Sequence, residues 1–259
     1  MSTTNAPLNI VMLCGNTRSS RMMYHALAET FHIARVVIEK KPSRLRMMRR
    51  RAKRLGLGTA AGQLLFVLFN KAVLAPRAEP RIAHLLQELG LNDAPIPESV
   101  VTRVESVNAP ETVHLLQTLQ PDAVVINGTR IIAKRVLTAT DAPFLNTHVG
   151  ITPRYRGVHG GYWALAMDDA EHCGVTVHLV DEGIDTGNVL YQATIHPTPQ
   201  DSFNTYPILQ IGAAIPLMRA ALTDIQRGTL TPREGVPPSR LWYHPTLWQY
   251  FKYRLRGVK

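Results

Sequence analysis

The segments at residues 9–14 and 122–127, "NIVMLC" and "DAVVIN", consist almost entirely of apolar side chains. Strands that are covered on both faces read as continuous hydrophobic runs, whereas strands with one wet face alternate between apolar and polar residues. Stretches with helical periodicity separate such runs from the N-terminus as far as Gly150, as in a parallel sheet with crossover helices. We therefore predict an α/β fold with a Rossmann-like, mostly parallel sheet and flanking helices. The expected strands lie within residues 9–14, 34–39, 99–108, 122–127 and 142–148, and the expected helices within 19–30, 81–90, 109–120 and 161–168.

The last third of the chain has a different pattern. Residues 174–181 and 188–195 are predicted to form a pair of strands, and residues 202–225 a long helix with proline interruptions. From Gln226 onward the chain is basic and aromatic. This stretch is interpreted either as a small appended element or as a tail docked on the core.

The formal net charge of +10 comes from one short segment. Residues 40–54 hold nine Lys and Arg and no acid, which leaves 20 basic against 19 acidic residues elsewhere. They begin an insertion over residues 40–75, predicted to be helical because one helical face carries Leu45, Met48, Ala52 and Leu55. Three interpretations remain open: a helical pair packed on the sheet with solvated charges, a basic amphipathic surface that contacts anionic membrane through residues 40–55, or a nucleic-acid contact.

Cysteine content and hydropathy favour a cytoplasmic protein. Cys14 and Cys173 each lie inside an apolar stretch, which fits buried thiols in a reducing compartment better than a disulfide framework. The longest strongly apolar run, residues 64–69, is far shorter than the roughly 18 residues of a membrane-spanning helix. We therefore expect a cytoplasmic location, with peripheral membrane contact through the insertion as one option.

Polar side chains gather at the end of the strand predicted at 142–148. Residues two apart on a strand share a face, so Asn146 and His148 point to the same side. They lie at the carboxyl end of this strand, where open α/β sheets bind their ligands. A carboxamide beside an imidazole provides an oxyanion donor and a base, and Asp185 in "DEGIDTGNV" can orient or charge-stabilise the imidazole. Such a trio suits acyl transfer to an amine without a metal or a covalent nucleophile, and no histidine spacing in the chain is typical of a metal site.

The sequence "NTHVGITPRYRG", followed about 17 residues later by "GVTVHLVDEGIDTG", resembles the folate-dependent formyltransferases. This family includes methionyl-tRNA, glycinamide ribonucleotide and sugar-nucleotide N-formyltransferases. The resemblance covers roughly residues 8–225, interrupted by the basic insertion, and places Asn146, His148 and Asp185 on the family's catalytic asparagine, histidine and aspartate. It implies a catalytic domain over residues 1–200 and a C-terminal helix with a basic, aromatic appendage over residues 201–259.

The resemblance also implies 10-formyltetrahydrofolate as the one-carbon donor, with no metal. His148 would act as general base, Asn146 would stabilise the oxyanion, and Asp185 would support His148 or assist protonation of the departing folate nitrogen. The folate would lie between the loop at 126–132 and the loop at 181–185. The residues expected to hold it are Ile126, Asn127, Gly128, Thr129, Asp181 and Gly183.

A second group of residues is predicted to bind the acceptor. The loop "CGNTRSSR" opens a helix, where free N–H groups favour an anion, and resembles the phosphate loop of the glycinamide ribonucleotide enzyme except for Thr17. An ordinary strand-to-helix turn remains the alternative for this loop, and a loop-stabilising hydrogen bond remains the alternative for His159. The acceptor candidates are Gly15, Asn16, Thr17, Arg18, Arg154, Arg156, His159, Tyr162 and Trp163.

Three acceptors compete within the family. The stretch that follows the long helix, from Gln226 to Lys259, is too short for the C-terminal barrel of the methionyl-tRNA branch, while the purine branch needs neither insertion nor tail. "YRGVHGGYWAL" resembles the sugar-nucleotide branch, and a GDP-linked 4-amino-4,6-dideoxysugar such as GDP-perosamine, used for surface polysaccharide (O-antigen) synthesis, is the leading expectation. The expected partners are this nucleotide sugar and folate, without nucleic acid, and a homodimer is compatible with the sequence. A noncatalytic nucleotide- or nucleic-acid-binding module is the alternative from a different class.

Overall fold

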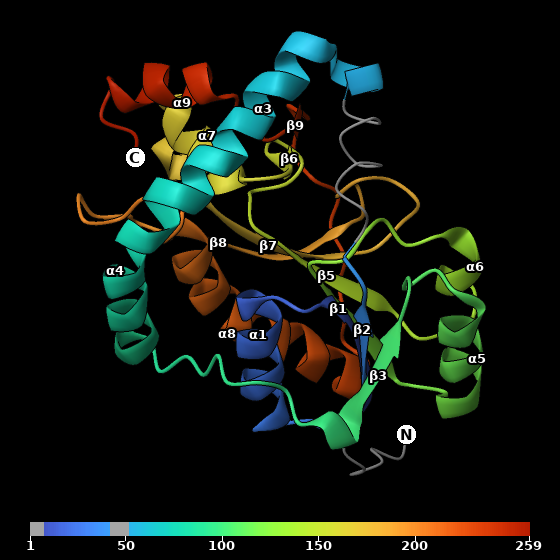
Figure 1. Ribbon diagram of the computed structural model, residues 1–259. Coiled ribbons are helices and arrows are strands. Elements are labelled where there is room, and N and C mark those ends of the chain that lie inside the picture. Colours follow the sequence, from blue (N-terminus) through green and yellow to red (C-terminus); the bar gives the residue numbers. More distant parts are fainter. Residues whose placement is uncertain (1–7, 42–51) are drawn as a thin grey trace.

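The computed structural model of the chain describes residues 8–41 and 52–259 (Figure 1). Seven strands form the central sheet: β1 (Asn9–Gly15), β2 (His32–Glu39), β3 (Val101–Val104), β4 (Ala123–Asn127), β5 (Phe144–His148), β7 (Gly174–Leu179) and β8 (Val189–Thr194). Their order across the sheet is β3-β2-β1-β4-β5-β7-β8. The first five run parallel to one another, whereas β7 pairs antiparallel with both β5 and β8. The Rossmann-like, mostly parallel fold class is therefore confirmed.

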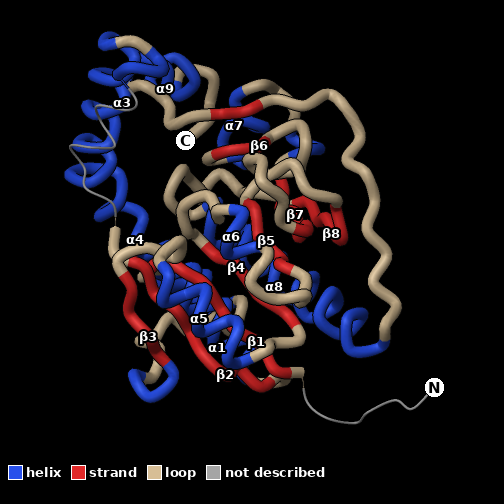
Figure 2. Tube along the Cα trace, turned by 90° about the vertical axis from the view of Figure 1, so that its right-hand side faces the viewer, coloured by secondary structure: helices blue, strands red, loops and turns tan. Residues whose placement is uncertain are grey.

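Helices cover both faces of this sheet (Figure 2). One face carries α1 (Arg18–Ala28), α4 (Ala75–Glu88) and α8 (Tyr206–Arg227), and the other carries α5 (Pro110–Leu119) and α6 (Lys134–Leu137). In β1, Ile10 and Met12 face the first group of helices, while Val11 and Leu13 face the second. All four side chains are fully buried, which is the reason for the continuous apolar run in this strand.

Helix α8 continues without a break through Pro216, so the prediction of proline interruptions is wrong. Pro207 lies in the first turn, where its missing N–H has no helical partner in any case. Pro216 removes one hydrogen bond from the helix interior. The packing of α8 against α1, β7 and β8 outweighs this local preference.

The described part of the insertion, from residue 52 onward, does not form a helical pair packed on the sheet, which was one of the interpretations of the insertion. Helix α3 (Leu57–Phe69) continues through a π-helical turn, η1 (Asn70–Leu74), into α4, and α3 packs against α9 (Leu247–Arg254) near the C-terminus. The Trp248 ring lies so close to Gly62 that a Cβ at this position would be 2.0 Å from it. Most of the segment predicted to form the basic amphipathic helix, residues 42–51, lies outside the described residues.

Two helical stretches in the described ranges, Leu57–Glu88 and Tyr206–Arg227, are long and apolar enough to cross a membrane by length and composition. The sequence-based expectation counted only uninterrupted apolar residues and did not identify these stretches; the location of the protein stays a prediction. The two stretches differ in their surroundings, because 44% of the most apolar window in α8 is buried but only 17% of the window in Leu57–Glu88. Helix α8 is thus a core helix, whereas α3 buries Phe66 but leaves Leu57, Leu65, Val67 and Leu68 exposed.

The segment after α8 runs along the outside of the sheet edge to reach the top of the molecule (Figure 2). Its strand β9 (Leu241–Trp242) pairs in parallel with β6 (Arg156–Gly157), which lies in the loop after β5. Beside this pair lie α7 (Gly160–Ala166) and the short 3-10 turn η3 (Ala170–His172); a second such turn, η2 (Glu98–Val100), precedes β3. The C-terminal residues are therefore docked on the loop that follows β5, which was one of the two interpretations of the tail. The expected domain boundary at residue 200 remains a prediction.

Candidate active site

The carboxyl end of β5 opens into a cavity of about 350 Å³. Asn146 and His148 both line it, as their two-residue spacing predicted, and Asp185 reaches it from the loop after β7. Strand β7 supplies a fourth polar side chain, because the antiparallel register places His178 directly beside Asn146. Strands β5 and β7 and the loop after β7 thus bring their polar side chains to one point.

His148 is held between two oxygen acceptors. Its Nε2 donates to the Tyr155 carbonyl oxygen at 2.6 Å, and its Nδ1 lies 3.3 Å from Asp185 Oδ2. Burial of the ring lowers the pKa of His148 below its ordinary value of 6.5, although the Asp185 carboxylate and the Tyr155 carbonyl oppose this effect. At neutral pH the ring therefore carries one proton, on Nε2, and its Nδ1 is free to accept a second.

Asp185 is arranged to remain ionised. Burial alone would raise the pKa of its carboxyl, but His148, His178 and the Gly157 N–H together lower that pKa to about 2. The Gly157 N–H donates to Asp185 Oδ2 at 2.8 Å. The backbone of Asp185 has φ 51°, a left-handed conformation that Asp tolerates better than most residues. A carboxylate is thus fixed where it can stabilise a positively charged His148.

His178 completes the site and was not among the predicted site residues. Its Nδ1–H donates to the Leu179 carbonyl at 2.7 Å, and its Nε2 points toward the Asn146 amide. This Nε2 accepts from Asn146 Nδ2 at 3.1 Å. Since Asp185 Oδ1 also faces Asn146 Nδ2, at 3.4 Å, both neighbours fix the amide with its nitrogen toward them, and the N–H in the longer contact with Asp185 is the one that can turn to a substrate oxygen. In the sequence, His178 is visible only as a histidine within the predicted strand "GVTVHLVD". That it lies beside Asn146 follows only from the register between β5 and β7.

We expect His178→Leu to lower kcat by a factor of about 10 to 100, because an Asn146 amide without this acceptor is free to turn its oxygen toward the cavity. The KM for each substrate should change little, since His178 orients a donor and does not bind either substrate by itself. His178→Gln, which places an acceptor oxygen near the position of Nε2, should restore most of the rate. The exposed His196 supplies the control, His196→Leu. An equal loss in the Leu and Gln variants, accompanied by loss of thermal stability, would show that His178 has only a packing role.

The two loops predicted to hold folate line the same cavity. Ile126, Gly128 and Thr129 contribute from one side, and Asp181 and Gly183 from the other. Asp181 Oδ1 accepts from the Gly183 N–H at 3.0 Å and from the Thr186 hydroxyl at 2.7 Å, so the second loop is held in shape by its own residues. The exception is Asn127, which is buried and whose Oδ1 accepts from Ser19 and Ser20 of α1. Its side chain supports the first loop from behind and does not line the cavity, which corrects the prediction for this residue.

The loop after β1 borders a second cavity, of about 540 Å³, at the carboxyl ends of β1, β2 and β3. Gly15 contacts the Gly128 loop so closely that a Cβ would lie 2.7 Å from the Gly128 oxygen. The Thr17 hydroxyl accepts from the Ser20 N–H and caps α1, the ordinary role of such a residue in a strand-to-helix turn. Asn16 lines the cavity. The Arg18 guanidinium instead pairs with Glu79 and Asp93, so an anion would have to compete with both carboxylates for it.

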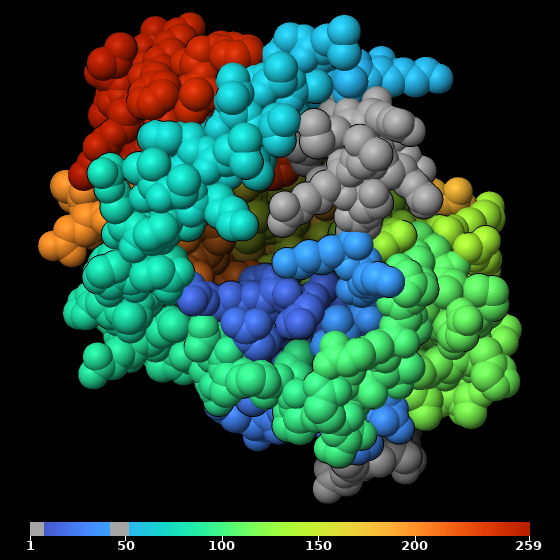
Figure 3. Space-filling view, in the orientation of Figure 1, coloured from blue at the N-terminus to red at the C-terminus, as the bar shows by residue number. Residues whose placement is uncertain are grey.

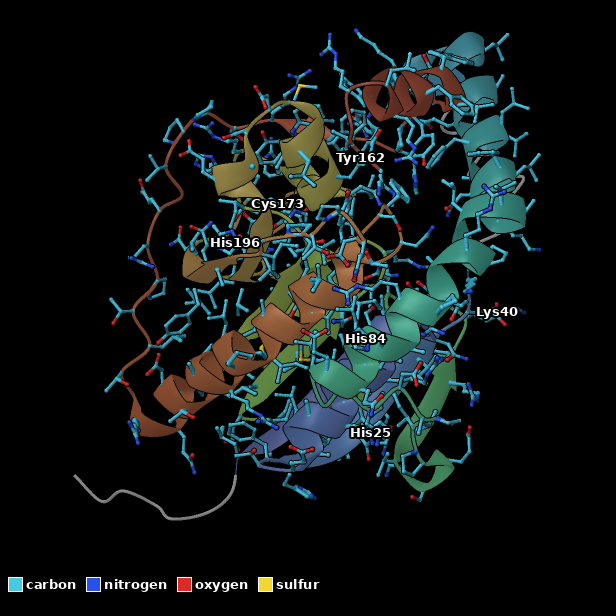
Figure 4. All side chains as sticks on the ribbon, turned by 90° about the vertical axis from the view of Figure 1, so that its left-hand side faces the viewer. His25, Lys40, His84, Tyr162, Cys173 and His196 are labelled. Carbon is cyan, nitrogen blue, oxygen red and sulfur yellow. The ribbon has the colours of Figure 1, made fainter. Side chains whose placement is uncertain are left out.

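The remaining acceptor candidates divide into two groups. Tyr162 and Trp163, both on α7, are buried in an aromatic core, so the prediction that they line a sugar site is corrected; Tyr162 is labelled in Figure 4. His159 bonds His244 at 2.9 Å, which favours its loop-stabilising interpretation. Arg156 lies beside the site: its Nη1 donates to the Ile184 carbonyl oxygen, and its buried Nε has no hydrogen-bond partner among the described residues. Of this group, Arg156 retains the best position for an anionic substrate.

Arg154 belongs to a different cluster. It pairs at 2.9 Å with Asp169, which together with Glu171 and His172 forms the one group in the described ranges whose side chains could hold a metal ion. Asp169 already accepts from the Tyr155 hydroxyl as well as from Arg154, so its oxygens are engaged. None of these residues lines the cavity at Asn146.

The C-terminal tail supports the site from behind. Trp242 stacks on Tyr155 with a ring-centroid separation of 5.6 Å and on Trp163 at 4.9 Å. Its carbonyl accepts from the Val158 N–H at 3.2 Å, next to Gly157. Tyr155 and Gly157 are the residues whose backbone groups bind His148 and Asp185. The tail thus fixes the loop whose backbone binds His148 and Asp185.

Comparison with known proteins agrees with this geometry. A formyl transferase family model matches residues 8–207. A methionyl-tRNA formyltransferase from Acidobacterium capsulatum is 35% identical over 122 residues, which are 46% of this chain and 38% of that protein. One from Synechococcus sp. is 36% identical over 143 residues, or 53% of this chain and 42% of that protein. The chain thus spans about two fifths of the length of the curated relatives it matches.

Solved structures share the fold across nearly the whole chain. A sugar N-formyltransferase from Shewanella sp. superposes with a TM-score of 0.58 at 14% identity, covering 96% of this chain and 87% of that one. A glycinamide ribonucleotide transformylase from Symbiobacterium toebii gives 0.57 at 17% identity, covering 91% and 100%. With a family match over most of its length and the trio of polar residues at the end of β5, this chain belongs to the formyl transferase family.

Proposed function

We propose that the protein transfers the formyl group of 10-formyltetrahydrofolate to the amine of a nucleotide-linked amino-deoxysugar. The observation that carries this proposal is the convergence of Asn146, His148 and Asp185 on one cavity, with the donor, the base and the carboxylate that amine formylation needs. Neither cysteine offers a covalent route, because burial raises the pKa of both Cys14 and Cys173 to about 12. At neutral pH both are protonated thiols, and a direct attack by the amine is the simpler path.

The cavity fits a reduced pterin. Its walls are apolar at Ile126, Ile132 and Val180, and its rim carries the backbone and side-chain groups of the two loops. Apolar walls with a few fixed polar groups are typical of sites for flat heterocycles. The folate supplies a formyl group on nitrogen, activated for attack by an amine.

The residues of this chain then have separate roles. One N–H of Asn146 turns from Asp185 Oδ1 to the formyl oxygen as this oxygen gains negative charge, an interaction that strengthens in the transition state, while the other stays on His178. His148 accepts a proton from the attacking amine on Nδ1, while Nε2 keeps its proton for the Tyr155 carbonyl. Asp185, ionised at any pH well above 2, stabilises the imidazolium that results. The imidazolium would then give its proton to the folate nitrogen as the bond between that nitrogen and the formyl carbon breaks.

The second cavity supports a nucleotide-linked acceptor. It lies next to the first, since the Gly15 and Gly128 loops touch and Arg130 of one cavity bonds Glu39 of the other. Lys40, Lys41 and Arg103 line it beside Glu39 and Glu105. A diphosphate would take Lys40 and Arg103 from their ion pairs with Glu105 and Glu98, whereas Lys41 supplies positive charge that balances neither carboxylate. Among such acceptors, a GDP-linked 4-amino-4,6-dideoxysugar such as GDP-perosamine is our leading candidate, in a cytoplasmic step of surface polysaccharide synthesis.

A panel of acceptors tests this assignment. With 10-formyltetrahydrofolate as donor, we expect the GDP-linked 4-amino sugar to exceed its dTDP and UDP counterparts, glycinamide ribonucleotide and methionyl-tRNA by about a hundredfold in kcat/KM. His148→Ala is the control for uncatalysed formylation. Methionyl-tRNA is the second candidate, because the curated relatives bear that name. A preference for methionyl-tRNA would replace our assignment, and no turnover with any amine would favour a noncatalytic binding module.

A further inference from the structure

The solvent-facing side of α3 is apolar. A surface helix ordinarily turns charged or polar residues to water. In α3 the outward stripe instead consists of Leu57, Ala61, Leu65 and Leu68, and Leu57 is 79% exposed. Gln63, one of only two polar side chains in this helix, points inward and donates to the His244 carbonyl. The helix therefore offers water a face of the kind that proteins normally cover.

Helix α9 extends this apolar face. Trp248, Phe251 and Leu255 follow one another at helical spacing and are 54%, 46% and 90% exposed. The Trp248 ring lies against Gly62 of α3, and the Phe251 ring is 5.4 Å from that of Phe69. Two helices from opposite parts of the sequence thus join their apolar stripes into one surface, which forms the top of the molecule in Figure 3. We call this the α3–α9 surface.

The charge around this surface has one sign. Residues 52–78 and 235–259 contain nine Lys and Arg and no Asp or Glu. Among them, Lys53, Lys71 and Lys252 are exposed on or next to α3 and α9. All 19 acidic residues of the chain lie outside these two segments. Apolar side chains with lysines on or next to the same helices match the chemistry of an anionic bilayer surface.

We propose that the α3–α9 surface docks the protein onto anionic membrane, with its leucines and Trp248 in the headgroup region and its lysines on the lipid phosphates. Docking is peripheral, because α4 continues directly from α3 and is anchored in the core by Ile82, Leu85 and the buried ion pair of Arg81 with Asp201. The aliphatic character of the outward stripe distinguishes this surface from a nucleic-acid site, where polar and stacking side chains predominate. The proposal is independent of which amine the enzyme formylates.

Vesicle binding tests the proposal with the full chain. We expect co-sedimentation with vesicles of one part phosphatidylglycerol to two parts phosphatidylcholine, at least tenfold weaker binding to phosphatidylcholine alone, and weakening as salt rises. Leu65→Gln with Leu68→Gln should reduce binding at least fivefold at low salt, and so should Lys53→Gln with Lys71→Gln and Lys252→Gln. Leu89→Gln with Val236→Gln, which changes exposed aliphatic residues elsewhere, should bind like the unmodified protein.

Tryptophan fluorescence provides a second readout. Of the three tryptophans, Trp163 and Trp242 are buried, so a blue shift on adding vesicles reports Trp248 and should vanish in Trp248→Phe. Equal sedimentation of all variants would overturn the proposal. So would an absence of vesicle binding, whether accompanied by tight binding to transfer RNA or by a dimer that the Leu65 and Leu68 changes dissociate.

Discussion

Replacing Asn146 with alanine should lower kcat by a factor of about 10² to 10³, the usual loss when one oxyanion donor is removed. Replacing His148 with alanine should lower it by about 10² to 10⁴, the range for loss of a general base. Folate affinity, measured by calorimetry, should change little in the Asn146 variant, because the walls of the cavity come from other residues. Turnover that survives both changes would rule out this site. His196→Ala provides the control, since His196 is exposed and does not line the cavity.

The pH dependence of kcat gives a sharper test of the role of His148. Its pKa lies below the ordinary 6.5, so the ring stays neutral and able to accept a proton until the pH falls below that value. With saturating acceptor, kcat should therefore be level from pH 8 down to about 6.5 and decline only at lower pH. The Asp185 carboxyl causes no further change of kcat in this pH range, since its pKa is about 2. A decline that begins above pH 7 would contradict the direction assigned to His148.

Removing the tail after Pro238 is the second change with a large expected effect. The truncation takes away the Arg240 and Trp242 carbonyls that accept from the Arg156 and Val158 N–H groups, together with the Trp242 ring that covers Tyr155. His148 and Asp185 depend on the backbone of this loop, so kcat should fall at least a hundredfold, as expected when catalytic groups shift by about 1 Å.

Two point changes separate a positional effect from general unfolding. Trp242→Ala should destabilise the protein by about 3–5 kcal/mol, the usual cost of deleting a large buried aromatic side chain. Trp242→Phe keeps most of the packing and should retain the fold with a smaller loss of kcat. Activity that stays normal in a folded, truncated protein would show that the tail does not support the site.

Short sequence segments were sufficient to predict the features of this protein that depend on the geometry of a single strand. The continuous apolar runs of β1 and β4 reflect helices on both faces, and the two-residue spacing of Asn146 and His148 determines that they share a side. These features depend on burial and strand alternation, which a short segment reveals by itself.

Contacts between distant segments were not predictable in this way. Tyr162 and Trp163 follow the reaction loop directly, yet Trp163 donates to the carbonyl of Tyr243, far along the chain, and lies in the core. An aromatic residue at the start of a helix fits a ligand site or a core equally well until the covering segment is known. The Arg18 pairs with Glu79 and Asp93 and the His178 contact with Asn146 were hidden for the same reason.

The position of the insertion in the strand order also determines where this protein can change its length. Because side chains alternate along a strand, adding one residue to β5 or β7 would turn Asn146 or His178 to the opposite face. The insertion of residues 40–75 instead enters between β2 and β3, at the other edge of the sheet from the β5–β7 pair. New segments can therefore be gained or lost there over evolutionary time, while the strand alternation that places Asn146 and His178 at the cavity stays unchanged.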